Sequence, residues 1–248
     1  MRVIISPAKK MIVDDSIEYR NLPAFIDKAE ELKNYLSSLT YEELKKIWKC
    51  NDKIALENFE RINKMDLRRG LTPAVLSYSG IQYTYMAPSV FSYDEFEYIE
   101  NTLRILSGFY GILRPFDGVA PYRLEMQAKI GLSGYKDLYD FWGRSLTEKL
   151  LEETDVVVNL ASKEYSKCVY NYIKGRAQFI TCVFGEQIDG RIVEKGTMCK
   201  MARGEMVRFM AQNNIASLEE IKKFSVGGYV FCSQMSDSEN YVFIKNKI

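Results

Sequence analysis

The segment 106–126 holds the densest group of residues that could bind a phosphate. It reads LSGFYGILRPFDGVAPYRLEM and contains Gly108 and Gly111, which permit tight backbone turns and close approach by a partner. Arg114 and Arg123 carry fork-shaped guanidinium groups that suit phosphate or carboxylate. A Gly-x-x-Gly turn next to arginines therefore predicts a contact with an anion such as the phosphate of DNA.

The residues before this segment predict a helix that would present the glycine turn. Ser92 and Glu95 have the spacing of a capping box, and apolar residues follow at helical spacing up to Leu106. Gly108 is a natural helix stop, so we expect a helix, a Gly-x-x-Gly turn and a short apolar turn that ends at Pro115, which is roughly a helix–hairpin–helix. Pro115 leaves little room for the second helix. A glycine-capped helix followed by a structural loop is the alternative.

Two further polar residues follow the first predicted strand, at residues 3–5. Ser6 and Lys9 lie just beyond its carboxyl end, where binding sites of α/β architectures often collect. Ser6 could contact phosphate. Lys9 could bind phosphate or, if stripped of water, act as a nucleophile. The alternative is a strand that ends in a proline turn with a solvated lysine.

A second strand end carries a similar group. Residues 156–160 form a branched apolar run that predicts a buried strand, and its end contains Asn159. Ser162 follows and could cap a helix that continues through Tyr165. These residues are candidates for phosphate contact or, for Tyr165, proton transfer. A plain helix cap with a surface carboxylate nearby, Glu164, is the alternative.

A third group lies on a predicted helix at residues 200–212. Lys200, Arg203 and Gly204 share one face at 100° per residue, and Arg208 lies at the edge of that face. A glycine inside a helix costs about 1 kcal/mol relative to alanine, which predicts a close approach by another element at Gly204. The basic residues could bind an anion, or they could extend into solvent as an ordinary basic face.

The absence of histidine narrows the possible chemistry. Catalysis by Ser-His-Asp or Cys-His groups and His-ligated metal sites are excluded. Five widely spaced cysteines without a CxxC motif argue against a zinc site and favour reduced thiols in the cytoplasm, so we expect neither metal nor cofactor. The formal net charge is +1, so nucleic-acid binding would require basic residues to be concentrated on one part of the surface.

The element pattern predicts a single compact α+β domain over residues 1–248, with a mixed sheet surrounded by helices. Apolar residues make up 47% of the chain, which is enough for a large core, and no run reaches transmembrane length. We expect residues 76–86 to be extended and residues 137–150 to form one helix. Asp189 and Gly190 predict the turn of a late hairpin.

Six short stretches, spread over nearly the whole chain, together resemble one protein family. They are IISPAK at 4–9, LSGFYGILRPFD at 106–117, PYRLEM at 121–126, KDLYDFWG at 136–143, NLAS-EY across 159–165 and ARG-M-RF across 202–209. On these stretches the chain is identified as a member of the YaaA family of peroxide stress proteins, also called UPF0246 or DUF328. The resemblance implies a cytoplasmic α+β protein with a basic cleft, a helix–hairpin–helix-like element that binds DNA, and a role in DNA protection or repair.

The resemblance favours contact with the phosphate backbone of duplex or branched DNA, with little sequence specificity. The expected phosphate-binding residues are Ser6, Lys9, Gly108, Gly111, Arg114, Arg123, Asn159, Ser162, Lys200, Arg203 and Arg208. The alternative is an enzyme that processes nucleic acid or a nucleotide, such as an abasic-site lyase with an imine on Lys9 and Glu125 or Tyr165 as proton carrier. A third class is a stress-linked factor that limits iron, but the sequence contains no cluster of metal ligands that would support direct iron binding. We expect DNA and DNA-repair proteins as partners and no association with a membrane. The sequence leaves the oligomeric state open.

Overall fold

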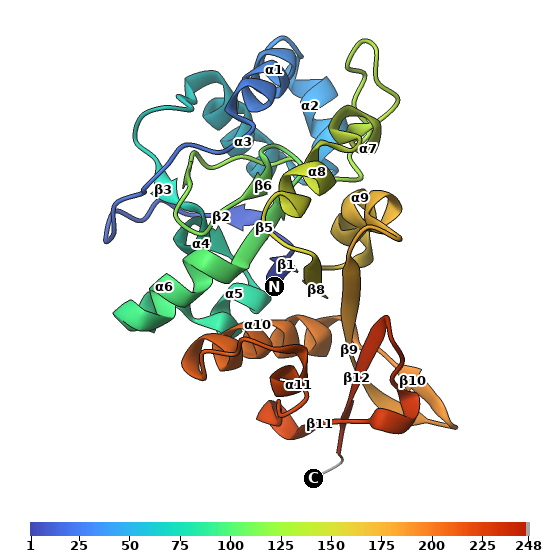
Figure 1. Ribbon diagram of the computed structural model, residues 1–248. Helices are drawn as coiled ribbons and strands as arrows, with labels where there is room; N and C mark the ends of the chain where they lie inside the picture. The colour runs from blue at the N-terminus through green and yellow to red at the C-terminus, as the bar shows by residue number, and fades with distance from the viewer. Residues whose placement is uncertain (247–248) are drawn as a thin grey trace.

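The fold is built on a mixed eight-stranded sheet (Figure 1). The computed structural model describes residues 1–246. The strand order is β11-β12-β9-β8-β1-β5-β6, and β10 also pairs with β9. The strands are β1 (Arg2–Ile5), β5 (Leu103–Ser107), β6 (Gly111–Leu113), β8 (Val156–Leu160), β9 (Gln178–Ile188), β10 (Arg191–Val193), β11 (Tyr229–Phe231) and β12 (Asn240–Lys245). Two short ladders pair β2 (Lys10–Met11) with β4 (Tyr78–Ser79) and β3 (Thr72–Pro73) with β7 (Gly118–Val119).

The five central strands, from β12 to β5, are parallel, and the pairs at the two ends of the sheet are antiparallel. In the β1–β8 pair Ile4 lies opposite Asn159 and Ile5 lies opposite Leu160. Both strands consist mainly of branched apolar residues and are buried on both faces, as is typical of parallel sheets covered by helices. Because they end level with each other, the polar residues that follow them lie at the same edge.

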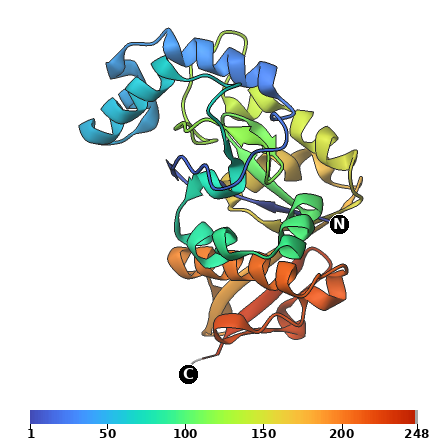
Figure 2. The same ribbon diagram turned by 90° about the vertical axis from the view of Figure 1, so that its left-hand side faces the viewer.

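Helices cover both sides of these strands (Figures 1 and 2). They are α1 (Ile26–Ser37), α2 (Tyr41–Trp48), α3 (Asp52–Lys64), α4 (Ala74–Ser77), α5 (Ile81–Met86), α6 (Tyr93–Thr102), α7 (Leu138–Trp142), α8 (Ser145–Leu151), α9 (Lys163–Ile173), α10 (Gly196–Gln212) and α11 (Leu218–Ile221), with 3₁₀ turns η1 (Pro88–Val90), η2 (Val226–Gly228) and η3 (Ser233–Met235). α5, α6 and α10 pack together on one side of β1 and β8, whereas α8 and α9 pack together on the other. α1, α2 and α3 project from one end of the molecule (Figure 2). This is the expected α+β arrangement. None of the helices in the described range is long and apolar enough to cross a bilayer.

Helix α10 crosses α5 at Gly204, which confirms the close approach expected from a glycine at this position. A Cβ added to Gly204 would overlap the carbonyl oxygen of Gln82 and would lie 2.9 Å from the backbone nitrogen of Met86. The absence of a side chain therefore lets the backbones of the two helices touch. The contact fixes the distance between the basic residues of α10 and the polar residues of α5.

The prediction of a helix–hairpin–helix-like element at 92–115 is wrong. Helix α6 ends at Thr102, and the next residues form strand β5, a tight turn and strand β6, with Ser107 paired to Gly111. Gly108 is buried, and a Cβ added to it would lie 2.6 Å from the carbonyl oxygen of Leu124. Gly111 is buried too, has a φ of +79° and packs beside Trp142. A DNA phosphate therefore has no access to either glycine, and their role is to close a buried β-hairpin.

The reason for this error lies in the apolar run after α6. Leu103, Ile105 and Leu106 are all buried, as a strand covered on both faces requires, and a short run of this kind has no periodicity that separates a helix from a strand. Two smaller expectations also fail. Residues 76–86 are mostly helical, in α4 and α5, and the helix expected over 137–150 breaks at Gly143, whose φ is +48°.

The loop after β6 contains a buried carboxyl group whose protonation should affect stability. The side chain of Asp117 is 3% exposed and accepts a hydrogen bond of 2.8 Å from the backbone N–H of Arg114. Burial raises the pKa of Asp117 from 3.8 to about 7. At a pH between these two pKa values, Asp117 thus keeps a proton in the folded chain that it has released in the unfolded chain. The contribution of Asp117 to stability is therefore complete below pH 4 and is lost as the pH rises through 7.

We predict that Asp117→Asn removes this pH dependence. Asparagine retains an oxygen that can accept the Arg114 N–H, and it cannot ionise. Between pH 4.5 and 7.5 the wild-type free energy of unfolding should fall relative to that of the variant by on the order of 2 kcal/mol. Urea unfolding of both proteins at several pH values measures the difference. Parallel pH profiles would show that Asp117 does not titrate in this range.

Candidate functional site

A cavity of about 380 Å³ lies at the carboxyl ends of β1 and β8. We call it the first chamber. Its walls come from the segments after β1 and β8, from α5 and α10, and from the chain at 122–125. Its basic side chains are Lys9, Lys10, Arg123, Lys200 and Arg203. Its other polar side chains are Ser6, Ser79, Gln82, Tyr83, Tyr122, Glu125, Ser162, Glu164 and Tyr165. Five segments that are distant in sequence thus converge on one basic, hydroxyl-lined cavity.

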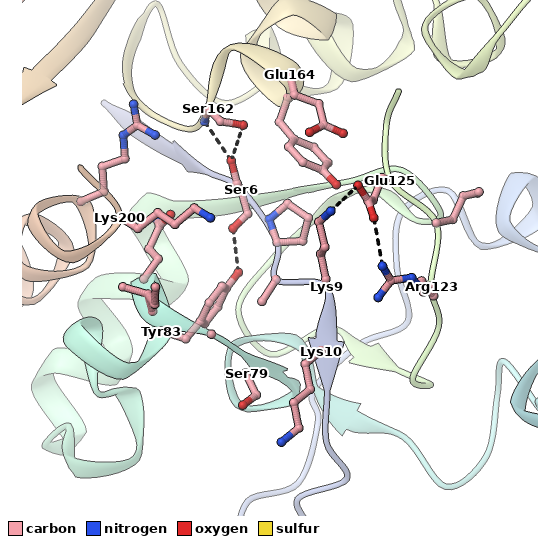
Figure 3. A pocket seen from close by; sticks show the side chains of 18 of the residues that line it. Ser6, Lys9, Lys10, Ser79, Tyr83, Arg123, Glu125, Ser162, Glu164 and Lys200 are labelled. Atoms are coloured by element: carbon pink, nitrogen blue, oxygen red, sulfur yellow. Dashed lines mark hydrogen bonds and ion pairs between the residues drawn. The ribbon is translucent and has the colours of Figure 1, made fainter. Parts of the chain in front are cut away.

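Ser6 ties together three walls of the first chamber (Figure 3). Its Oγ accepts a hydrogen bond of 2.9 Å from the backbone N–H of Ser162 and donates one of 3.3 Å to the Oγ of Ser162. Its carbonyl oxygen accepts a bond of 3.1 Å from the hydroxyl of Tyr83 on α5. Ser162 is the N-cap residue of α9, yet its side chain caps no backbone N–H of that helix. Its hydroxyl proton therefore remains able to donate to a ligand.

A chain of ion pairs crosses the opposite wall (Figure 3). The Nζ of Lys9 lies 2.8 Å from one carboxylate oxygen of Glu125, and a terminal nitrogen of Arg123 lies 3.4 Å from the other. Lys9 has a side chain that is 65% exposed, so it stands in water at the mouth. Glu125 is thereby balanced by two cations, and its charge does little to repel an incoming anion.

Burial raises the pKa values of two other ionisable groups of the first chamber. Burial raises the pKa of Glu164 above its usual range, and the nearby charge of Glu125 raises it further. Burial also raises the pKa of Tyr165 well above its ordinary value. Tyr165 thus keeps its hydroxyl proton and can donate a hydrogen bond, but its arrangement does not suit a general base.

A wider cavity of about 810 Å³ adjoins the first and shares Ser162, Lys200 and Arg203 with it. We call it the second chamber. Lys163 and Lys167, one turn apart on α9, line it on one side. Asn159 lines its floor, where its Oδ1 accepts a bond of 2.9 Å from the backbone N–H of Ala161. The two chambers lie next to each other along the carboxyl edge of the sheet, and we call them together the cleft.

The structure brings most of the predicted residues to this cleft and leaves four outside it. Ser6, Lys9, Arg123, Glu125, Ser162, Tyr165, Lys200 and Arg203 line the first chamber, and Asn159 lines the second. Gly108, Gly111, Arg114 and Arg208 line neither chamber. Arg114 lies near the amino ends of the central strands, where Arg2, Arg104 and Arg114 surround the carboxylate of Glu153. The arginine beside the glycine turn is thus remote from the basic cleft.

Sequence reasoning missed four residues that shape the cleft. Gln82 and Tyr83 lie on α5, a segment that we expected to be extended. Gly204 indicated that another element approaches α10 closely, but the sequence did not show that this element is α5. Lys163 and Lys167 were also missed, although their spacing of four residues after the Ser162 cap puts both on one helix face.

The fold and the cleft define an α+β protein with a basic, hydroxyl-lined cleft at the carboxyl edge of a mixed sheet. Residues 1–235 match the family described as Peroxide stress protein YaaA. The chain is also 54% identical to a UPF0246 protein of Lachnoclostridium phytofermentans, over all of this chain and 97% of that protein. A UPF0246 protein of Agathobacter rectalis is 54% identical over 98% of each chain. The chain belongs to the peroxide stress protein YaaA family.

Proposed function

We propose that this protein binds DNA through the two-chambered cleft and acts in the response to peroxide stress. The observation that carries the proposal is the concentration of positive charge, because the whole chain has a net charge of only +1. Within the described residues, seven basic side chains line the cleft: Lys9, Lys10, Arg123, Lys163, Lys167, Lys200 and Arg203. Four acidic side chains accompany them: Glu125, Glu164, Glu194 and Glu239. The family supports the link to peroxide stress.

The kind of side chain in the cleft supports contact with the DNA backbone and little reading of sequence. Lys9, Lys163, Lys167 and Lys200 are exposed, and each ends in a compact charge that suits a phosphate oxygen. Such contacts position a duplex or a branched structure but carry no base information. Binding of this kind would suit protection or repair of damaged DNA, where the sequence at the damaged site varies.

Salt dependence tests the proposal. Each lysine that neutralises a phosphate releases counterions, so the logarithm of the association constant should fall linearly with the logarithm of salt concentration, with a slope of about −0.9 per contact on duplex DNA. Mobility-shift titrations of unrelated duplex and branched sequences at several salt concentrations measure this slope. Absence of binding at low salt, or an affinity that salt leaves unchanged, would reject the proposal.

The structure does not favour the alternative in which Lys9 forms an imine with an abasic sugar. A lysine nucleophile requires loss of water around its amine, whereas Lys9 is 65% exposed and its ammonium group is paired with Glu125. We therefore predict that borohydride traps no covalent adduct between the protein and DNA that contains an abasic site. The gel assay is run on wild type and Lys9→Ala side by side. An adduct that forms with wild type and disappears in Lys9→Ala would establish the lyase instead.

A further inference from the structure

The first chamber contains buried hydrogen-bond donors that have no acceptor. In the described part of the chain, five buried side-chain nitrogen or oxygen atoms lack a hydrogen-bond partner, and three of them belong to residues of this one cavity. They are Nε2 of Gln82, Nε of Arg123 and Nε of Arg203. A buried donor without a partner costs about 1–3 kcal/mol, so three around one cavity indicate a site prepared for a ligand.

The chemistry of these three atoms defines the ligand. All three are donors, and two belong to guanidinium groups, so the missing partner is an acceptor with negative charge. The residues that carry them are firmly held, because Gln82 is 7% exposed and the side chains of Arg123 and Arg203 are 12% and 14% exposed. The hydroxyl of Ser162, held by Ser6, is a fourth donor that lines the same cavity. A phosphate group accepts several hydrogen bonds at once and fits this set.

The shape of the two chambers favours a phosphate at the end of a strand over a phosphate inside the backbone. The first chamber is the smaller, at about 380 Å³, and segments from five parts of the chain enclose it. A continuous duplex backbone would have to pass through it, whereas the end of a strand can enter and stop. A terminal phosphate monoester also offers three terminal oxygens and up to two negative charges, and an internal diester offers two oxygens and one charge. The second chamber, at about 810 Å³, is wide enough for the strand that leads to this end.

We propose that the first chamber recognises the terminal phosphate monoester of a nucleic-acid strand while the second chamber holds the adjoining backbone. Gln82, Arg123 and Arg203 contact the phosphate oxygens after small side-chain rotations, and Lys9 and Lys200 close the mouth. The inference rests on the proposed DNA binding and names the part of DNA that the cleft prefers. Strand breaks carry such ends, at the 5′ or the 3′ side, so the cleft would concentrate the protein at breaks.

Matched DNA ends test this inference. Fluorescence anisotropy compares one duplex with a 5′-phosphate, a 3′-phosphate or hydroxyl groups at its ends, and a closed dumbbell of the same sequence without ends. Wild type should bind one of the phosphorylated ends about tenfold more tightly than the hydroxyl ends or the dumbbell. In Gln82→Glu, which keeps size but places a carboxylate in the wall, the preference should fall to within about twofold, and Arg123→Ala should behave alike. Lys53 is exposed on α3 and lies outside the cleft, so the Lys53→Ala variant should retain the preference for the phosphorylated end.

Each other outcome overturns a defined part of the account. Equal affinity for all four DNAs would reject the terminal-phosphate subsite and leave DNA binding standing. A preference that survives both Gln82→Glu and Arg123→Ala would place end recognition elsewhere on the protein. Adenosine monophosphate that competes as well as the phosphorylated duplex end would show that the cavity serves a free nucleotide. Failure to bind any of the DNAs at low salt would reject the proposed function as well.

Discussion

Replacement of Gly204 by alanine should lower the free energy of unfolding by about 3 kcal/mol, although alanine is normally the better helix residue by about 1 kcal/mol. The added Cβ would overlap the carbonyl oxygen of Gln82 and would lie 3.0 Å from the Cβ of Tyr85. Because the first contact is to backbone, no side-chain rotation relieves it, and α5 and α10 must move apart. Chemical denaturation of wild type and variant measures the loss.

The matched control lies on the same helix. A Cβ at Gly196, the first residue of α10, would meet no heavy atom within 4 Å, so Gly196→Ala should change stability by less than about 1 kcal/mol. The contrast also bears on the cleft, since α5 carries Gln82 and α10 carries Lys200 and Arg203. The Gly204→Ala variant should therefore also bind DNA more weakly than wild type, because its helices α5 and α10 are separated. Equal stabilities of the two variants would contradict the close crossing.

The double substitution Lys200→Ala with Arg203→Ala should weaken DNA binding about a hundredfold at low salt and reduce the salt slope by about two. These residues belong to the wall that the two chambers share, so they can contact phosphates on either side. The loss should be similar for unrelated sequences, because phosphate contacts carry no base information. Mobility-shift titrations over a salt series give both numbers.

A control double variant separates a local effect from a general loss of charge. Lys53→Ala with Lys64→Ala removes two positive charges from the exposed side of α3, outside both chambers. This pair should leave the affinity within about threefold of wild type, because salt largely screens exposed charges that lie far from the bound DNA. If both double variants lose affinity equally, net charge governs binding and the cleft has no special role.

The sequence predicted the strands that end in the cleft but could not predict which strand ends meet. The runs at 3–5 and 156–160 indicated β1 and β8, and Ser6 and Ser162 were recognised as candidates beyond them. Their contact depends on the parallel register that places Ile5 opposite Leu160. Pairing between strands about 150 residues apart is a property of the whole fold, and no local pattern encodes it.

The hairpin at 103–113 shows where local reasoning fails. The capping box at Ser92 was read correctly, and α6 begins there as expected. Its C-terminus was misplaced because a strand buried on both faces carries the same apolar residues as the buried side of a helix. Gly108 and Gly111 consequently looked like a phosphate-binding turn, whereas their contacts with Leu124 and Trp142 show a packing requirement. Residue type alone does not separate these two uses of glycine.

Protection of individual lysines by DNA tests the central claim most directly. If DNA phosphates lie in the cleft, bound DNA should slow acetylation of its exposed lysines, which are Lys9, Lys163, Lys167 and Lys200. Lys53 on α3 should react at the same rate with and without DNA. Mass spectrometry after brief acetylation, at a salt concentration where DNA is bound, quantifies each site. Protection of Lys53 with unchanged reactivity of the cleft lysines would contradict the account.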